Sequence, residues 1–228
     1  MRWTCLLPLV AAAACSGLEE GEGGVVGLEL EFPELRTLEI DEQAQLSARA
    51  LDADGDVVEA PITWRATTAA LSVDPTGLVT AIAPGSGEVQ AVVGSLASER
   101  IGFTIVLRAD TLIIEGDSVL VIPLDVDPPA TATLPVRMES FDPAGPVGSR
   151  PVIYEIVQPV AGATPVVQLV GGVQIDTVNT AADGLASVVL GAVAGQIPPD
   201  TAIVEFRANR TRGAPVPGSG QRFIVLFQ

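Results

Sequence analysis

Residues 62–93 read ITWRATTAALSVDPTGLVTAIAPGSGEVQAVV, and this stretch decides the fold class. Apolar and polar side chains alternate at its start, so that Ile62, Trp64 and Ala66 would share one face of a strand. A Pro-Thr-Gly turn at residues 75–77 then interrupts the pattern. Short alternating segments separated by turns predict an antiparallel meander or Greek key in which each sheet buries one face.

The motifs of this stretch also carry a family resemblance. Trp64 on its strand, the Thr-Gly-Leu-Val turn at 76–79 and the Ala-Pro-Gly corner at 83–85 resemble the bacterial Ig-like group 2 (BIG2) family, over residues 28–106. In such a fold Trp64 would fill the space between two sheets, and Gly77 and Gly85 would form turns that a Cβ would obstruct. The family has no shared catalytic residue, so the resemblance implies a module of adhesins and surface proteins.

The second half of the chain repeats the alternation. Leu134, Val136 and Met138 alternate with polar residues, and an Asp-x-x-Gly turn at 142–145 and a Thr-x-x-Asp-Gly-x-Ala turn at 180–186 follow. This order resembles the invasin-type bacterial Ig-like group 1 (Big-1) domains. We therefore expect an all-β chain with two tandem immunoglobulin-like β-sandwiches, at residues 27–107 and 108–228. The insertions at 157–165 and 211–220 have no place in the resemblance and are either binding loops or connections.

The N-terminus reads as an export signal. Residues 1–14 contain one Arg, a short apolar run and three small residues before Cys15, which together resemble a bacterial lipobox. Cleavage would leave Cys15 acylated and attached to a membrane, whereas ordinary signal cleavage would release a soluble protein. Residues 15–26 would form an acidic, Gly-rich tether. The expected location is the cell envelope, at the outer membrane or cell surface.

Composition excludes several classes of function. The net charge is −16, His is absent and every basic residue is an Arg, so we expect no nucleic-acid partner. Without His or Lys the commonest general bases and Schiff-base amines are missing, and we expect no enzyme, no cofactor and no catalytic residue. Lipid at Cys15 would be the contact with the membrane.

Asp52, Asp54 and Asp56 invite a calcium hypothesis, because carboxylates at alternate positions can converge on a hard cation. Gly55 is not at the position that an EF-hand loop requires. The alternative is a hairpin turn, for which Asp and Gly are suited, and we favour the turn.

These observations predict a non-catalytic envelope module for adhesion, binding or spacing, with a protein or glycan partner. One alternative is a structural subunit of an envelope assembly or filament, which would exchange an edge strand through residues 223–227. Another is a carbohydrate-active protein with an acidic cleft on the second domain.

Overall fold

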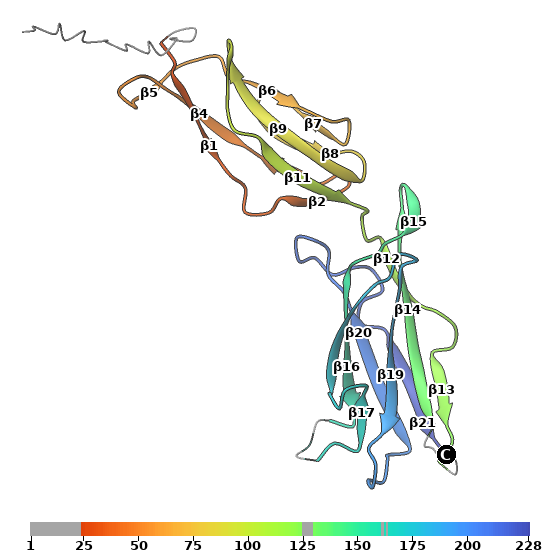
Figure 1. Ribbon diagram of the computed structural model, residues 1–228. Helices are drawn as coiled ribbons and strands as arrows, with labels where there is room; N and C mark the ends of the chain where they lie inside the picture. The colour runs from red at the N-terminus through yellow and green to blue at the C-terminus, as the bar shows by residue number, and fades with distance from the viewer. Residues whose placement is uncertain (1–23, 125–129, 161, 163) are drawn as a thin grey trace, which may run out of the picture.

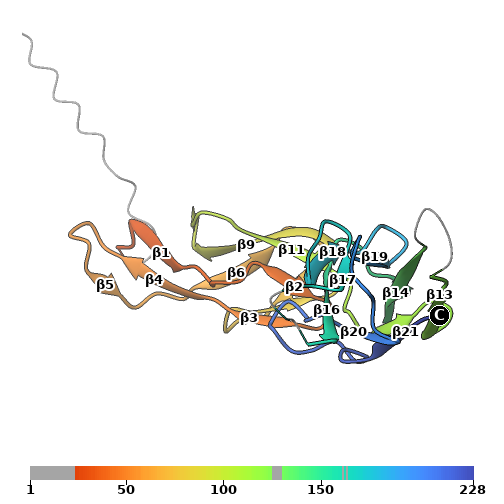
Figure 2. The same ribbon diagram turned by 90° about the horizontal axis from the view of Figure 1, so that it is seen from below.

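The computed structural model describes residues 24–124, 130–160, 162 and 164–228. The described chain consists of β-strands and loops and contains no helix. Its strands form two sandwiches that follow one another end to end, with residues 107–110 between them (Figures 1 and 2). The all-β class and the tandem sandwiches are therefore confirmed. In the described part of the chain no helical segment has the length and apolar character needed to cross a membrane.

The first domain is built from short strands. They are β1 (Gly27–Glu31), β2 (Thr37–Glu39), β3 (Gln43–Gln45), β4 (Ser47–Leu51), β5 (Val57–Val58), β6 (Thr63–Ala66), β7 (Leu71–Val73), β8 (Leu78–Ala81), β9 (Gly85–Val93), β10 (Leu96–Ala97) and β11 (Ile101–Val106). They form sheets with the orders β1-β4-β5, β3-β8-β7 and β10-β9-β11-β2, and β6 pairs with β9.

The predicted alternation sets the core of the first domain. Trp64 and Ala66 turn inward from β6 and pack on the core, whereas Thr63 and Arg65 are exposed. On β9, Val89 faces the same core. The alternation expected from the sequence is confirmed for β6, because one face of this strand packs on the core and the other is exposed.

The two glycines that were expected to form turns differ in what constrains them. Gly77 has a φ of 84°, and a Cβ there would meet the indole of Trp64 and the carbonyl oxygen of Leu46. Gly85 has a φ of 144°, but a Cβ there would have no atom within 4 Å. The expected steric obstruction is therefore confirmed at Gly77 and wrong at Gly85, where the backbone angle alone favours glycine.

The second domain has longer strands. They are β12 (Thr111–Ile114), β13 (Val119–Ile122), β14 (Thr131–Phe141), β15 (Ala144–Pro146), β16 (Pro151–Gln158), β17 (Val167–Leu169), β18 (Ile175–Asn179), β19 (Leu185–Ala192), β20 (Thr201–Arg207) and β21 (Arg222–Phe227). One sheet has the order β12-β14-β19-β17, with β15 beside β14, and the other has the order β13-β21-β20-β16-β18.

The core between these two sheets contains the aromatic side chains of Tyr154, Phe206 and Phe223, all fully buried. The Phe206 ring lies 6.3 Å from the Tyr154 ring and 5.6 Å from the Phe223 ring, between centroids. The Tyr154 hydroxyl donates a 2.9 Å hydrogen bond to the carbonyl of Ala186 on the facing sheet. A buried hydroxyl needs such a partner, so this bond ties the two sheets together.

Two pairings depart from the antiparallel arrangement that the sequence predicts. β2 runs parallel to β11, and β13 runs parallel to β21. β21 therefore has a partner on each side, because β20 pairs with its other edge. The expectation that residues 223–227 form an exchangeable edge strand is wrong, since both rows of backbone hydrogen-bonding groups are already used.

Candidate functional site at the domain interface

The parallel pairing of β2 with β11 brings an acidic turn to the linker. The two strands run in the same direction and end side by side, with Glu39 opposite Val106. The amide of Ile40 donates a 3.1 Å hydrogen bond to the carbonyl of Val106. Residues 39–42 therefore lie where the chain leaves the first domain, and Leu107 packs against the cores of both domains.

The acidic turn, residues 39–42, holds three carboxylates: Glu39, Asp41 and Glu42. Its backbone is fixed to β8 by hydrogen bonds from Asp41 N to Ala81 O, at 2.9 Å, and from Ala81 N to Glu42 O, at 3.0 Å. A Glu42 carboxylate oxygen also accepts a 2.9 Å bond from the amide of Glu39. The turn is therefore part of the folded first domain, and it presents its side chains to the second.

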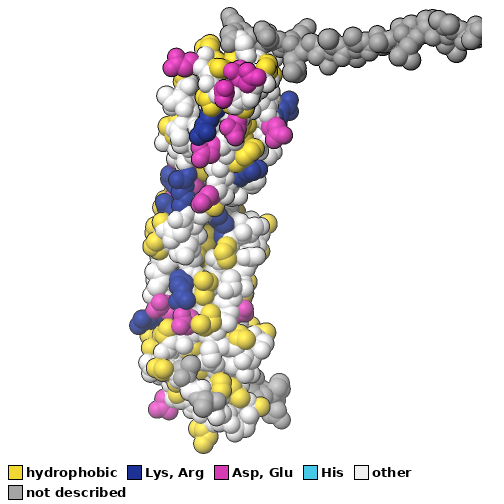
Figure 3. All heavy atoms as spheres, turned by 90° about the vertical axis from the view of Figure 1, so that its left-hand side faces the viewer, with side chains coloured by type: hydrophobic (Ala, Val, Ile, Leu, Met, Phe, Trp, Pro, Cys, Tyr) yellow, Lys and Arg dark blue, Asp and Glu magenta, His cyan; other side chains and the backbone are white. Residues whose placement is uncertain are grey.

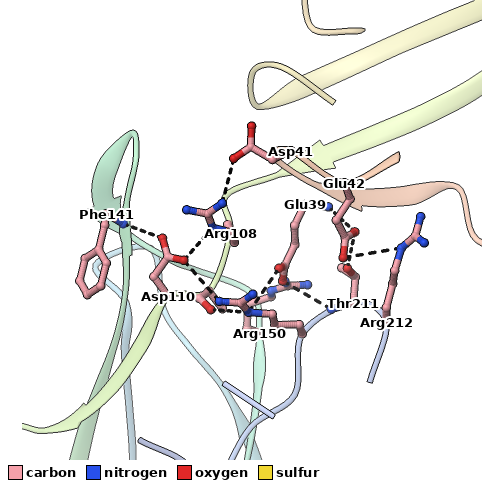
Figure 4. Close-up of polar contacts among 11 residues, drawn as sticks. Glu39, Asp41, Glu42, Arg108, Asp110, Phe141, Arg150, Thr211 and Arg212 are labelled. Atoms are coloured by element: carbon pink, nitrogen blue, oxygen red, sulfur yellow. Dashed lines mark hydrogen bonds and ion pairs between the residues drawn. The ribbon is translucent and has the colours of Figure 1, made fainter. Parts of the chain in front are cut away.

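The second domain meets this turn with an arginine cluster, which we define as Arg108, Arg150, Arg210 and Arg212. Figure 4 labels three of them, Arg108, Arg150 and Arg212. Arg108 comes from the linker, Arg150 precedes β16, and the other two follow β20. Figure 3 shows several basic side chains near the middle of the elongated molecule. A third of the twelve basic residues of an acidic chain thus gather where the domains meet.

Asp110 organises part of this cluster. Its carboxylate accepts hydrogen bonds from Arg108 Nε at 2.7 Å, from Arg210 Nη2 at 3.4 Å and from the amide of Phe141 at 2.8 Å. Burial opposes the charge of this carboxylate, whose side chain is 7% exposed, but the bonds from Phe141 and Arg108 outweigh it and lower the pKa of Asp110. The same bond with Asp110 raises the pKa of Arg108.

The contacts across the interface centre on Glu39, which is 1% exposed. Its carboxylate forms an ion pair with Arg150 and lies 4.0 Å from Arg210 Nε. The amide of Thr211 donates a 3.4 Å hydrogen bond to the same carboxylate. The first domain thus places one buried negative charge close to two guanidinium groups of the second. Figure 4 shows Glu39 beside one of them, that of Arg150.

Around Glu39, at the rim of the interface, the other two carboxylates of the turn also pair with groups of the second domain. Arg108 Nη1 lies 2.8 Å from a carboxylate oxygen of Asp41, and the Thr211 hydroxyl donates a 2.9 Å bond to Glu42. Arg212 lies 3.7 Å from the Glu42 carboxylate and also donates to the carbonyl of Gln43. Every acidic side chain of the turn therefore has a partner from the second domain.

Burial leaves the central pair with little hydrogen bonding. Among the described atoms, Glu39 Oε2 and the Nε and Nη2 atoms of Arg150 are buried without a hydrogen-bond partner of good geometry. Burial also lowers the pKa of Arg150, although an Arg stays charged at neutral pH. The two groups are held together by their opposite charges, and each would be costly to leave buried alone.

The residues singled out from the sequence lie elsewhere. Cys15 and most of the tether are outside the described residues. Asp52 caps its own turn, because its carboxylate accepts bonds from the amides of Asp54, at 3.0 Å, and Asp56, at 2.9 Å. No group of three or more acidic, His or Cys side chains in the described ranges is placed to hold a metal. The calcium hypothesis stays a prediction, as does the acidic cleft.

Sequence reasoning missed the interface almost entirely. It did single out the insertion at 211–220, whose first residues Thr211 and Arg212 contact the first domain. The available signal was the pairing of an acidic turn, Glu-Ile-Asp-Glu at 39–42, with Asn-Arg-Thr-Arg at 209–212. Nothing in either segment says that the other is its partner.

Comparison with known proteins gives structural neighbours only. No protein-family model matches the sequence, and no curated protein matches it. The fold is similar to that of the Yersinia pseudotuberculosis adhesin InvE, at 15% identity and a TM-score of 0.44, over 91% of this chain and 62% of that one. It is similar to the Escherichia coli adhesin FdeC, at 13% identity and a TM-score of 0.49, over 87% and 63%. It is also similar to domains 4 and 5 of the S-layer protein SbsC, at 16% identity and a TM-score of 0.34, over 89% and 98%. The chain thus spans less than two thirds of either adhesin chain.

Proposed function

We propose that this chain is a non-catalytic module of the cell envelope that holds a binding surface away from a membrane at a set angle. The observation that carries the proposal is the ionic interface, which joins two sandwiches end to end through Glu39 and the arginine cluster. Two domains connected by a loose linker would reorient freely, whereas paired charges at the junction restrict their angle. A restricted angle is useful to a protein that displays or spaces a surface.

The positions of the N-terminal strand and of the loops of the second domain indicate which end of the molecule would face away from the membrane. β1 starts at the end of the first domain remote from the interface (Figure 1). At the opposite end of the molecule lie the described residues that follow β13, β16 and β19, and the next strand after each of them belongs to the other sheet (Figure 1). We call these described residues the distal loops, and an attachment at the N-terminus would leave them farthest from it.

The distal loops carry exposed aliphatic side chains. Val160 is 85% exposed and Ile197 is 90% exposed, and Leu124 is also exposed. Loops on a rigid sandwich commonly carry binding residues, and exposed apolar side chains gain free energy when a partner covers them. In this proposal the loops contact a protein or glycan partner.

Attachment at the other end rests on the sequence. The Ala-Ala-Ala-Cys motif at 12–15 supports acylation of Cys15, and the acidic Gly-rich residues that follow would serve as a tether. More than one acyl chain makes such an anchor durable, since each buried methylene contributes about 0.8 kcal/mol. We propose the outer membrane or cell surface as the location.

Mass spectrometry of the mature protein from a membrane fraction tests the anchor. We expect an acylated N-terminal Cys15, and loss of membrane association for Cys15→Ala. An unmodified terminus at any other residue in the wild-type protein would contradict lipid attachment.

Retention of the purified chain on panels of immobilised glycans and extracellular proteins tests the display surface. We expect at least one retained partner, and weaker retention for the double variant Val160→Ser, Ile197→Ser. Ile82→Ser is the matched control, because Ile82 is an aliphatic side chain 51% exposed on the first domain. Equal loss with the control, or no retained partner, would count against the distal loops.

A further inference from the structure

We propose that the domain interface is an electrostatic latch: opposite charges lock the two sandwiches at one angle, and their neutralisation releases the angle about Leu107 and Arg108 while both domains stay folded. The inference rests on the proposed function only in that a set angle would serve display. Its physical basis is independent of where the protein is located or what it binds.

The two domains have separate cores. The core of the first domain ends in sequence at Ile105, and that of the second begins at Ala109. Leu107 is partly buried and packs against both. Because Leu107 is the one described side chain that the two clusters share, we expect each core to keep its own apolar contacts when the angle between the domains changes.

Charged side chains hold the interface. Glu39 faces Arg150, which precedes β16, and it faces Arg210 and Thr211 in the loop after β20. From its own turn it faces Glu42, which has the same charge and bonds to the Glu39 amide. Loss of the guanidinium groups would leave two neighbouring carboxylates to repel each other, which favours the open angle.

A charge buried between two domains can be hydrated again when the domains move apart, whereas a charge buried within a domain core cannot. Removing one member of a buried ion pair normally destabilises the fold, because the remaining charge is left without water or a partner. Here the remaining Arg150 or Glu39 can regain water if the domains swing apart. The expected consequence is reorientation of the domains without unfolding.

The net charges of the two facing surfaces make the interface sensitive to salt. The turn contributes three negative charges, and the facing surface contributes four Arg and Asp110, for a net charge of opposite sign. The separated surfaces attract each other over a range of about 10 Å at 0.1 M salt, and over about 3 Å at 1 M salt. Salt should therefore weaken the latch, more strongly at the rim pairs of Arg108 with Asp41 and Arg212 with Glu42 than at the buried pair of Arg150 with Glu39.

Distances between spin labels on the two domains test the latch in the full chain. Labels are attached to Ser72→Cys on β7 and Ser187→Cys on β19, both exposed, after Cys5 and Cys15 are replaced by Ser. We expect one narrow distance distribution at low salt and a broader one at 1 M salt. Glu39→Gln should broaden it at low salt, with about a tenfold fall in the ratio of closed to open molecules.

The matched control is Glu205→Gln. Glu205 also pairs with an Arg, at 2.9 Å from Arg222, but this pair lies on one sheet of the second domain, away from the interface. It should leave the distance distribution as in the parent protein. Circular dichroism and thermal unfolding of each variant report whether both domains remain folded.

The outcomes separate cleanly. Broadening with Glu39→Gln and with salt, but not with Glu205→Gln, while unfolding is unchanged, supports the latch. An unchanged narrow distribution overturns it, as does unfolding of the first domain by Glu39→Gln, which would make Glu39 part of that domain's own stability. None of these results depends on acylation of Cys15 or on retention of a partner, so the proposed function can fail separately.

Discussion

Gly77 lies directly against the indole ring of Trp64, so closely that a Cβ on Gly77 would come within 2.9 Å of Cε2 of the ring. The turn between β7 and β8 and the inward-facing Trp of β6 thus occupy complementary space. The carbonyl of Leu46 lies on the same side, 2.7 Å from that Cβ position. This one contact joins the strand and the turn that the sequence presents as separate motifs.

Gly77→Ala should destabilise the first domain by about 2–4 kcal/mol, because it adds both backbone strain and overlap with the indole. Gly55→Ala is the matched control, since Gly55 has a φ of 86° but no atom within 4 Å of its Cβ position. We expect about 1 kcal/mol for the control, from strain alone. Urea unfolding curves measure both, and equal losses would show that the contact with Trp64 does not matter.

Tyr154→Phe should destabilise the second domain by about 1–2 kcal/mol. The substitution keeps the ring in place but leaves the buried carbonyl of Ala186 without its 2.9 Å donor. Burial also raises the pKa of Tyr154, so the hydroxyl stays a donor at neutral and mildly alkaline pH. Denaturant unfolding that matches the parent protein would mean that the hydroxyl contributes nothing net.

The sequence predicts strands well where one face of the strand is covered. Leu134, Val136 and Met138 on β14 are buried and their neighbours are less so, as the alternation indicates. It fails where pairing depends on distant chain segments, as in the parallel pair of β2 with β11. Alternation defines the faces of a strand but says nothing of the partner or direction at its edges.

The interface could not be predicted for a related reason. Leu38, Glu39 and Ile40 are all buried in succession, because the first domain covers one side of this segment and the second domain covers the other. A single domain would bury alternate residues and leave Glu39 in water. An acidic residue at the end of a strand therefore reads as solvated until the second domain is in place.

Asp52 should stabilise the first domain through the hydrogen bonds of its turn and not through a bound cation. Asp52→Ala removes the acceptor for the amides of Asp54 and Asp56, and we expect a loss of about 1 kcal/mol in the stability of the first domain. Asp54→Ala, which keeps that acceptor, should cost less. Calcium titrated into the parent chain should release no heat beyond dilution. Heat that disappears in both variants would favour the calcium hypothesis instead.

Asp110 should make the second domain sensitive to acid. Its folded-state pKa is lowered by the bonds from Phe141 and Arg108, which outweigh burial, so below the usual Asp value of about 3.9 the unfolded chain binds more protons than the folded one. The stability that this carboxylate contributes is fully present above that pH and is lost as the pH falls through the lowered value. Urea unfolding of the parent and of Asp110→Asn across this range measures the difference, which should be constant near neutrality and shrink in acid.

Glu115→Gln provides the comparison for Asp110. The hydrogen bond from Arg137 also lowers the pKa of Glu115, but this side chain is 43% exposed and its pair is screened by water. The difference in unfolding free energy between Glu115→Gln and the parent should also shrink as the pH falls, and it should be smaller than that of Asp110→Asn at every pH. If the difference in unfolding free energy between the parent and Asp110→Asn does not change between neutral and acidic pH, the bonds from Phe141 and Arg108 do not favour the ionised form of Asp110. In that case another group must hold the side chains of the arginine cluster in place.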